Sequence, residues 1–278
     1  MSAGHDALSA GTGSHVSSAA HSAAPGPAAR ARYVLRLADT SLVLAQRLAE
    51  WIGHAPALEE ELGLANISLD LLGQARALLT YAAELEGRGR SEDDLAYLRG
   101  PGEFLNATLA EQPNRDFAAA IVRQVLLDAF QMALYEGLAR SEDSRLAQIA
   151  AKSLAETRYH LRYSAGWLAR LGDGTEESRG RVRAALEDLW RFTGELTAGD
   201  DVEEAMAAAA LAPQASVIGE RWSALVGEVL AEARLERPAA ASSSPSVPSG
   251  KHGEHTEHLT QLLSEMQYLP RAHPGTRW

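Results

Sequence analysis

Five residues of the types that bind metals recur among apolar residues along this 278-residue chain. They are Glu50, Asp70, Asp128, Glu156 and His160. A di-iron centre in a helical bundle takes one Glu from each of two helices and a Glu-x-x-His motif from each of two others, all pointing inward. Here the third residue after Asp70 is Gly73, and the third after Glu156 is Tyr159. The sequence thus keeps the carboxylates of such a centre but lacks two of its imidazoles.

A carboxylate buried among apolar residues needs a charged or hydrogen-bonding partner, because an unpaired buried charge costs on the order of several kcal/mol. A metal pair, basic side chains, or a hydrogen-bond network around protonated carboxyls could supply it. Of nine histidines, His160 alone lies inside the predicted four-helix core, and it follows Glu156 by four residues instead of three. Basic residues are close in sequence to the carboxylates: Arg47, Arg76, Arg123, Lys152, Arg158 and Arg162. We favour a salt-bridged core, with the five residues as vestiges of a metal site and no catalytic, cofactor or metal site in this chain.

Three histidines near the C-terminus form a second cluster. His252, His255 and His258 are spaced by three, which places imidazoles on one face of a helix and could bind a metal ion. No carboxylate–His pair faces them from elsewhere in the sequence, so we favour a solvated helix start after Gly253.

The composition predicts an almost entirely helical chain, because Ala, Leu, Glu and Arg dominate and β-branched residues are sparse. Four main helices are expected, at residues 33–51, 57–85, 116–138 and 144–171. Shorter ones are expected at residues 92–98, 176–196, 213–235 and 254–269. A long connection between the second and third main helices favours a ferritin-like arrangement over a simple up-down bundle. We therefore predict an all-α, ferritin-like four-helix bundle with a long crossover and additional C-terminal helices.

The same pattern divides the chain into segments. Residues 1–32 are expected to be a disordered N-terminal tail, and residues 33–236 the ferritin-like helical domain. Residues 237–253, rich in Pro and Ser, are expected to be a flexible linker. Residues 254–278 form a C-terminal helix and tail of the same domain, docked either on its own bundle or on a partner.

Charge and hydropathy exclude several functions. A formal charge of -11 argues against nucleic-acid binding, which relies on clustered Lys and Arg. The sequence contains no run of the roughly 18 apolar residues that a membrane span needs, and its first thirty residues do not resemble a signal peptide. Zero Cys excludes disulfides and thiolate ligands. We expect a cytoplasmic protein.

Several long blocks of this sequence closely resemble the C subunit of the bacterial phenylacetyl-CoA epoxygenase (1,2-phenylacetyl-CoA epoxidase) complex. The blocks are LVLAQRLAEWIGHAPA at 42–57, LANISLDLLGQAR at 64–76, ETRYHLRYSAGWLARLGDGT at 156–175, LWRFTGEL at 189–196 and HTEHLTQLLSEMQYLPRAHPGTRW at 255–278. The resemblance covers nearly everything from Tyr33 onward except the Pro/Ser linker.

The resemblance implies a non-catalytic structural subunit of ferritin-like fold in a hetero-oligomer. The catalytic A subunit of such a complex carries the di-iron site and binds the acyl-CoA, and a reductase with flavin and iron-sulfur centres delivers electrons from NADPH. The implied reaction inserts one oxygen atom of O2 into the aromatic ring of phenylacetyl-CoA, during aerobic phenylacetate catabolism. This chain would hold no cofactor itself and would support the catalytic subunit.

Two other functions stay open from the sequence. The first is a His-poor di-metal oxygenase or oxidase that uses Glu50, Asp70, Asp128, Glu156 and His160. The second is a regulatory helical protein that binds a CoA ester without catalysis. Metal analysis and ligand-binding measurements separate them from a structural subunit.

Overall fold

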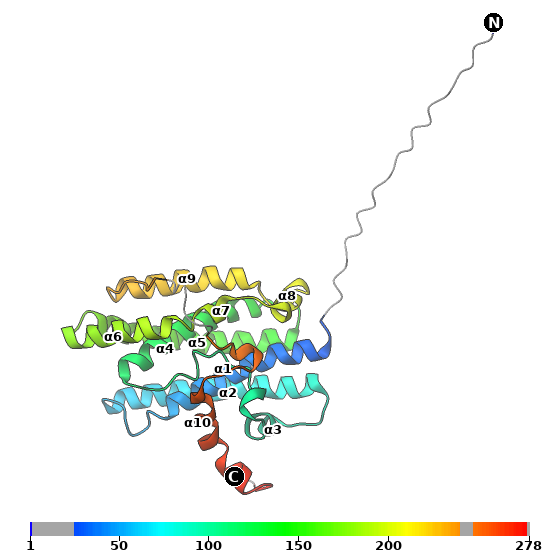
Figure 1. Ribbon diagram of the computed structural model, residues 1–278, viewed down its shortest axis with the longest axis horizontal. Helices are drawn as coiled ribbons and strands as arrows, with labels where there is room; N and C mark the ends of the chain where they lie inside the picture. Colours follow the sequence, from blue (N-terminus) through cyan, green and yellow to red (C-terminus); the bar gives the residue numbers. More distant parts are fainter. Residues whose placement is uncertain (2–24, 240–246, 277–278) are drawn as a thin grey trace.

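Four long helices form the body of the protein in a computed structural model that describes Met1 and residues 25–239 and 247–276 (Figure 1). They are α1 (Pro27–Ala49), α2 (Leu58–Glu86), α4 (Phe117–Leu138) and α5 (Ser144–Gly172). α1 packs along α2, and α4 packs along α5. The crossover between the two pairs carries α3 (Glu92–Tyr97) and a 3-10 turn, η1 (Pro101–Glu103). Within the described residues every regular element is helical, so the predicted all-α bundle with a long crossover is confirmed.

Local sequence signals fix where these helices begin and end. The Asp116 carboxylate accepts the Ala119 N–H at 2.8 Å at the start of α4. Asp143 accepts the Leu146 N–H at 3.0 Å at the start of α5. Gly87, with a φ of 63°, ends α2 in the left-handed region that glycine adopts without strain. Such caps satisfy the orphan N–H and C=O groups of each helix terminus.

α1 begins earlier than the sequence pattern indicated, because its first residue is Pro27 and not Tyr33. Proline suits the first turn of a helix, where its missing N–H has no partner to lose. Residues 27–32 therefore belong to α1, while residues 2–24 of the predicted tail lie outside the described part of the chain.

A third layer covers one side of the bundle. It contains α6 (Glu176–Trp190), α7 (Gly194–Thr197), α8 (Asp201–Ala208) and α9 (Ala215–Glu232). These helices pack on α1, α4, α5 and one another. The single helix predicted at 176–196 is divided, because a turn follows Trp190 in which the Thr193 hydroxyl donates to the Trp190 carbonyl. The sequence pattern also missed α8, which an Asp200–Glu203 capping box starts.

α4 is the central helix of the protein. Of the described helices it alone is long and apolar enough to cross a membrane by composition, yet 83% of that stretch is buried inside the protein. The Trp222 indole of α9 donates to the Leu126 carbonyl of α4 at 3.0 Å. Packing on both sides, by the bundle and by the third layer, explains why α4 is apolar around most of its circumference.

The chain returns to the bundle at its C-terminal end. This segment contains η2 (Gly250–His252), α10 (Glu257–Met266) and α11 (Tyr268–Ala272). The Gln267 amide donates to the carbonyls of Ala96 and Arg99, both at 3.0 Å. The segment therefore docks on its own crossover. Residues 240–246 of the predicted linker lie outside the described residues, and the division of the chain into domains stays a prediction.

Candidate functional site

Polar side chains from the four long helices meet inside the bundle, and Asp128 of α4 is the most deeply placed carboxylate among them. It is 0% exposed. The Gln124 amide donates to its Oδ1 at 2.6 Å, and the Ser164 hydroxyl of α5 donates to its Oδ2 at 2.8 Å. Burial raises the pKa of Asp128 to about 8, against the opposing effect of these two hydrogen bonds. Asp128 therefore holds a proton at neutral pH, and the basic partner predicted for it is replaced by a hydrogen-bond network.

His160 and Asp70 form a second pair, at the junction of α5 and α2. His160 Nε2 lies 3.1 Å from Asp70 Oδ2. The imidazole is fully buried, whereas the Asp70 side chain is 40% exposed. Burial lowers the pKa of His160, and the Asp70 carboxylate opposes this effect. A neutral imidazole that donates its Nε2–H to Asp70 fits this arrangement.

Glu156 lies at the α2–α5 edge and connects the surface to the interior. It accepts a hydrogen bond from the Gln74 amide at 3.0 Å, and Lys152 Nζ lies 3.6 Å from its other oxygen. The Tyr135 hydroxyl of α4 donates to the Gln74 carbonyl oxygen at 3.3 Å. The network therefore crosses from α5 through α2 to α4.

Glu50 does not join the other carboxylates, so its predicted inward placement was wrong. α1 ends at Ala49, and Glu50 is its C-cap on the protein surface. Its carboxylate accepts hydrogen bonds from Arg47 at 2.6 Å and from Asn114 at 2.9 Å. The residue stabilises the end of α1 and its contact with the crossover.

The donor set does not fit a di-iron centre. Among residues 25–239 and 247–276, no three His, Asp or Glu side chains lie close enough together to hold a metal ion. Gly73 is exposed, with nothing within 4 Å of where its Cβ would be, and Tyr159 is 41% exposed. Imidazoles at these two positions would lie on the outer surface. Whether the purified chain holds metal stays a question for metal analysis.

Four buried polar atoms of this interior have no hydrogen-bond partner among the described residues. They are Gln124 Oε1, Gln131 Oε1, Thr157 Oγ1 and His160 Nδ1. Leaving such an atom unsatisfied costs about 1–3 kcal/mol, and ordered water is the usual solution in protein interiors. The site can therefore bind water and pass hydrogen bonds between helices.

Sequence reasoning missed a buried carboxylate in the crossover, Glu111, which is 0% exposed. It accepts hydrogen bonds from Asn106 at 2.9 Å and from the Thr256 hydroxyl at 2.7 Å, and His255 Nδ1 lies 2.8 Å away. Burial opposes the charged form of His255, but Glu111 and the Phe104 carbonyl raise its pKa. No periodicity marks Glu111, because it lies outside any regular helix.

His252 and His258, the two other histidines of the C-terminal cluster, lie away from His255. The predicted placement of all three on one helix face was therefore wrong. His252 Nε2 is 3.5 Å from Asp200, and His258 lies in α10, where its carbonyl accepts from Arg47 at 3.0 Å. Gly253, at a φ of 80°, turns the chain between them. The solvated helix start that we favoured was also wrong for His255, whose side chain is 5% exposed.

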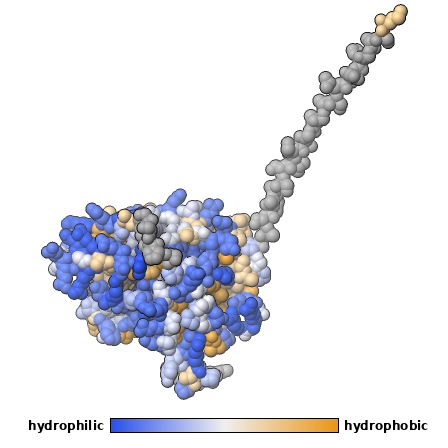
Figure 2. Space-filling view, viewed as in Figure 1, coloured by the Kyte–Doolittle hydropathy of each residue, from blue (hydrophilic) through white to orange (hydrophobic). Residues whose placement is uncertain are grey.

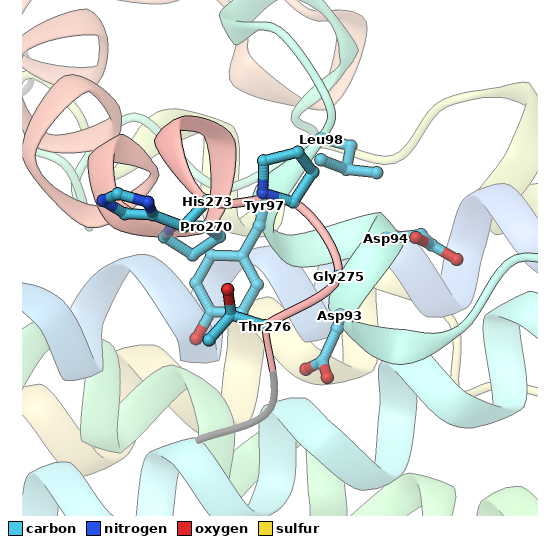
Figure 3. Close-up of a pocket in the computed structure, with 9 residues that line it drawn as sticks. Asp93, Asp94, Tyr97, Leu98, Pro270, His273, Gly275 and Thr276 are labelled. Carbon is cyan, nitrogen blue, oxygen red and sulfur yellow. The ribbon is translucent and has the colours of Figure 1, made fainter.

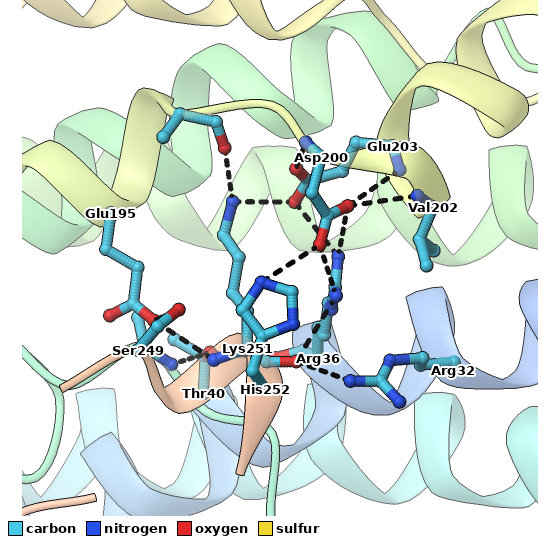
Figure 4. Close-up of polar contacts among 12 residues, drawn as sticks. Arg32, Arg36, Thr40, Glu195, Asp200, Val202, Glu203, Ser249, Lys251 and His252 are labelled. Atoms are coloured by element: carbon cyan, nitrogen blue, oxygen red, sulfur yellow. Dashed lines mark hydrogen bonds and ion pairs between the residues drawn. The ribbon is translucent and has the colours of Figure 1, made fainter. Parts of the chain in front are cut away.

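An ion-pair cluster holds η2 against α1 and α8 (Figure 4). Arg36 donates to both oxygens of Asp200, at 2.9 and 2.6 Å. Lys251 Nζ lies 2.7 Å from Glu203 Oε1 and donates to the Ala198 carbonyl at 2.7 Å. Burial alone would raise the pKa of Asp200, but the hydrogen bond from Arg36 lowers it well below its usual range. The cluster anchors the C-terminal segment.

Several surface hollows adjoin the crossover, and two of them involve the C-terminal segment. One of about 220 Å³ lies between α3 and the C-terminal segment and is lined by Asp93, Tyr97 and His273, among others (Figure 3). The other, of about 820 Å³, lies near the start of α1 and is lined by Arg32, Leu85 and others. Neither touches the buried network at Asp128 and His160. The face in Figure 2 is largely hydrophilic, with scattered apolar patches.

Two antiparallel helix pairs, a long crossover and a buried polar layer define a ferritin-like helical protein. A solved structure described as protein 19 with aldehyde deformylating oxidase activity, from Synechococcus, superposes with a TM-score of 0.54 over 78% of this chain and 94% of that one. The two share 19% identity, so this similarity shows the fold alone.

The chain belongs to the family of phenylacetic acid catabolic proteins, which matches residues 14–278. It is 49% identical over 246 residues to the C subunit of 1,2-phenylacetyl-CoA epoxidase from Escherichia coli (strain K12). That alignment covers 88% of this chain and 98% of the relative. The resemblance found in the sequence blocks is thereby confirmed.

Proposed function

We propose that this chain is the non-catalytic structural subunit of a multicomponent di-iron monooxygenase that epoxidises the aromatic ring of phenylacetyl-CoA. It supports the catalytic A subunit in aerobic phenylacetate catabolism. The similarity to the C subunit of an epoxidase supports the reaction class and the existence of partner subunits. We expect a cytoplasmic hetero-oligomer that includes the reductase.

The structural role is supported by the positions of the five candidate metal ligands, which do not converge on one point. Glu50 is an exposed helix cap. Asp70 is hydrogen-bonded to His160, and Glu156 is hydrogen-bonded to Gln74. Asp128 is fully buried and accepts hydrogen bonds from Gln124 and Ser164. Each side chain is engaged in holding helices together.

In this proposal the chemistry belongs to the partners. The di-iron centre lies in the catalytic subunit, and the flavin, the iron-sulfur centre and NADPH belong to the reductase. This chain contributes a rigid helical body that keeps its catalytic partner in the active conformation.

Reconstitution tests the proposal. The catalytic subunit, together with the reductase, is assayed for epoxidation of phenylacetyl-CoA with and without this chain, and iron is measured in each purified protein. We expect turnover to require the chain, while the chain itself holds far less than one iron. Full turnover without the chain contradicts a supporting role, and about two irons per chain favours a di-metal oxygenase instead.

A further inference from the structure

Three polar side chains inside the bundle each keep one atom without a hydrogen-bond partner among the described residues. The atoms are Gln131 Oε1 of α4 and Thr157 Oγ1 and His160 Nδ1 of α5. Thr157 and His160 are 0% exposed, and Gln131 is 2% exposed. Bulk solvent does not reach side chains buried to this extent, and such atoms normally have a partner. We call these three residues the central triplet.

The Thr157 hydroxyl is the clearest case, because it does not bond to its own helix. A threonine inside a helix commonly donates to the carbonyl one turn earlier. Thr40 donates in this way to the Arg36 carbonyl at 2.7 Å, and Thr80 donates to the Arg76 carbonyl at 2.8 Å. Thr157 makes no such bond within the described part of the chain. Its hydroxyl is therefore available to a group outside α5.

The register of α4 and α5 brings the central triplet together. The two helices run antiparallel, and the Ser164 hydroxyl donates to Asp128 at 2.8 Å between them. Gln131 follows Asp128 by three residues, and His160 precedes Ser164 by four. These two lie about 4.5–6 Å along the helix axes from that contact, at nearly the same level. Thr157 lies one turn further on the same face of α5 as His160.

The chemistry of the three atoms selects a small molecule that donates hydrogen bonds. Gln131 Nε2 donates to the Ser41 hydroxyl at 3.3 Å, which leaves Oε1, an atom that can only accept. Burial lowers the pKa of His160, so a neutral imidazole that donates Nε2–H to Asp70 keeps Nδ1 as a second acceptor. The Thr157 hydroxyl can donate or accept. Water, with two donors and two acceptors, matches this set.

A cation fits the same position less well. Asp128 is the fully buried carboxyl at this level, and both of its oxygens already accept hydrogen bonds, from Gln124 at 2.6 Å and from Ser164 at 2.8 Å. Asp70 contacts the opposite nitrogen of the His160 ring, Nε2. A buried cation without a free carboxylate is unfavourable, because it has lost its hydration without gaining a counter-charge.

A surface hollow leads toward the central triplet. It has a volume of about 200 Å³, lies between α2 and α5, and is lined by Gln74 and Ser153 among others. These two residues are 3% and 2% exposed, so they lie at its inner end. The Tyr135 hydroxyl of α4 donates to Gln74 from the interior at 3.3 Å. Tyr135 and Thr157 are each seven residues from the contact that fixes the register, so they are level with each other. Polar groups therefore continue from the hollow to the triplet.

We propose that Gln131, Thr157 and His160 bind an ordered water molecule between α4 and α5, and that this water exchanges with solvent through the hollow at Gln74 and Ser153. The water donates to Gln131 Oε1 and His160 Nδ1 and accepts from the Thr157 hydroxyl. It joins two helices of the bundle through hydrogen bonds that no side chain makes directly. This water site does not depend on the partner subunits.

Magnetic relaxation dispersion of water oxygen-17 tests the site, because it counts long-lived internal water molecules in the full-length chain. Thr157→Val removes the hydroxyl and keeps the side-chain shape. Thr80→Val is the matched control, since its exposed hydroxyl bonds to its own helix. We expect Thr157→Val to lose about one long-lived water and Thr80→Val to keep the wild-type number. An unchanged number in Thr157→Val overturns the proposed site.

Urea unfolding of Thr157→Val, Gln131→Met and the double variant tests whether the two side chains share one partner. We expect the double variant to shift the urea midpoint by clearly less than the two single shifts together, because both changes remove the same water. Additive shifts overturn a shared water. Circular dichroism of each variant verifies that the helices are intact.

A crystal structure at atomic resolution locates the molecule directly. We expect density for one oxygen atom about 2.7–3.2 Å from the three unpaired atoms, unchanged after dialysis against a chelator. A dry layer between α4 and α5 contradicts the proposal. Density that the chelator removes also contradicts it, because it assigns the position to a cation.

Discussion

His255 Nδ1 lies 2.8 Å from Glu111 Oε2, although 144 residues separate the two in the chain. Both side chains are almost completely buried. Through this pair the C-terminal segment closes over the crossover, which in turn packs against α1. The C-terminal segment is therefore an integral part of the core.

We expect His255→Gln to destabilise the protein most at acidic pH. The pKa of His255 is raised in the folded state, so its charged form contributes stability that is present below the unfolded value of about 6.5. That contribution is lost as pH rises through the raised folded pKa. Chemical unfolding from pH 5.5 to 9 should show a loss on the order of 1–3 kcal/mol that shrinks with rising pH. His252→Gln, at a 48% exposed side chain, is the matched control and should change little.

Asp128→Asn should stabilise the protein at alkaline pH. Because the folded pKa is about 8, the native state binds a proton that the unfolded state releases near pH 4, and stability falls as pH rises between these values. Each pKa unit corresponds to about 1.4 kcal/mol, so the advantage of the neutral amide at pH 8 is on the order of several kcal/mol. The variant and wild type should converge near pH 4–5. A constant difference across this range would contradict a buried neutral carboxyl.

Asp39→Ala should be among the most damaging substitutions in α1. Asp39 is 0% exposed, and both of its oxygens accept hydrogen bonds from Arg99, at 2.5 and 2.9 Å. Removing one member of a buried pair leaves the other charge uncompensated, at a cost of about 3–5 kcal/mol. Urea unfolding measures this loss. The exposed pair of Arg181 and Glu177 provides the comparison, since Glu177→Ala should cost less than about 1 kcal/mol.

Two glycine substitutions should act in opposite directions. Gly73→Ala should stabilise α2 by up to about 1 kcal/mol, because alanine is the better helix former and its Cβ meets open space. Gly137→Ala should destabilise, because its Cβ would lie 2.5 Å from Pro213 Cγ. Thermal unfolding of both variants tests this contrast. Equal effects at the two positions would show that helix propensity outweighs packing here.

Sequence reasoning placed the long helices well and the candidate site less well. The expected helices at 57–85, 116–138 and 144–171 match α2, α4 and α5 closely. Their apolar periodicity and their caps are local properties that a sequence displays directly. Glu50 was predicted to point inward along a continuous helix, but α1 ends at Ala49. The three terminal histidines were predicted on one helix, but the chain turns at Gly253 between His252 and the other two.

The sequence by itself determined the fold class, the family and the lack of two motif histidines beside Asp70 and Glu156. The tertiary structure alone decided which polar groups meet, such as Asp39 with Arg99 and Glu111 with His255. The physical reason is that helical periodicity records which face of an element is apolar, whereas the partner across that face comes from distant segments.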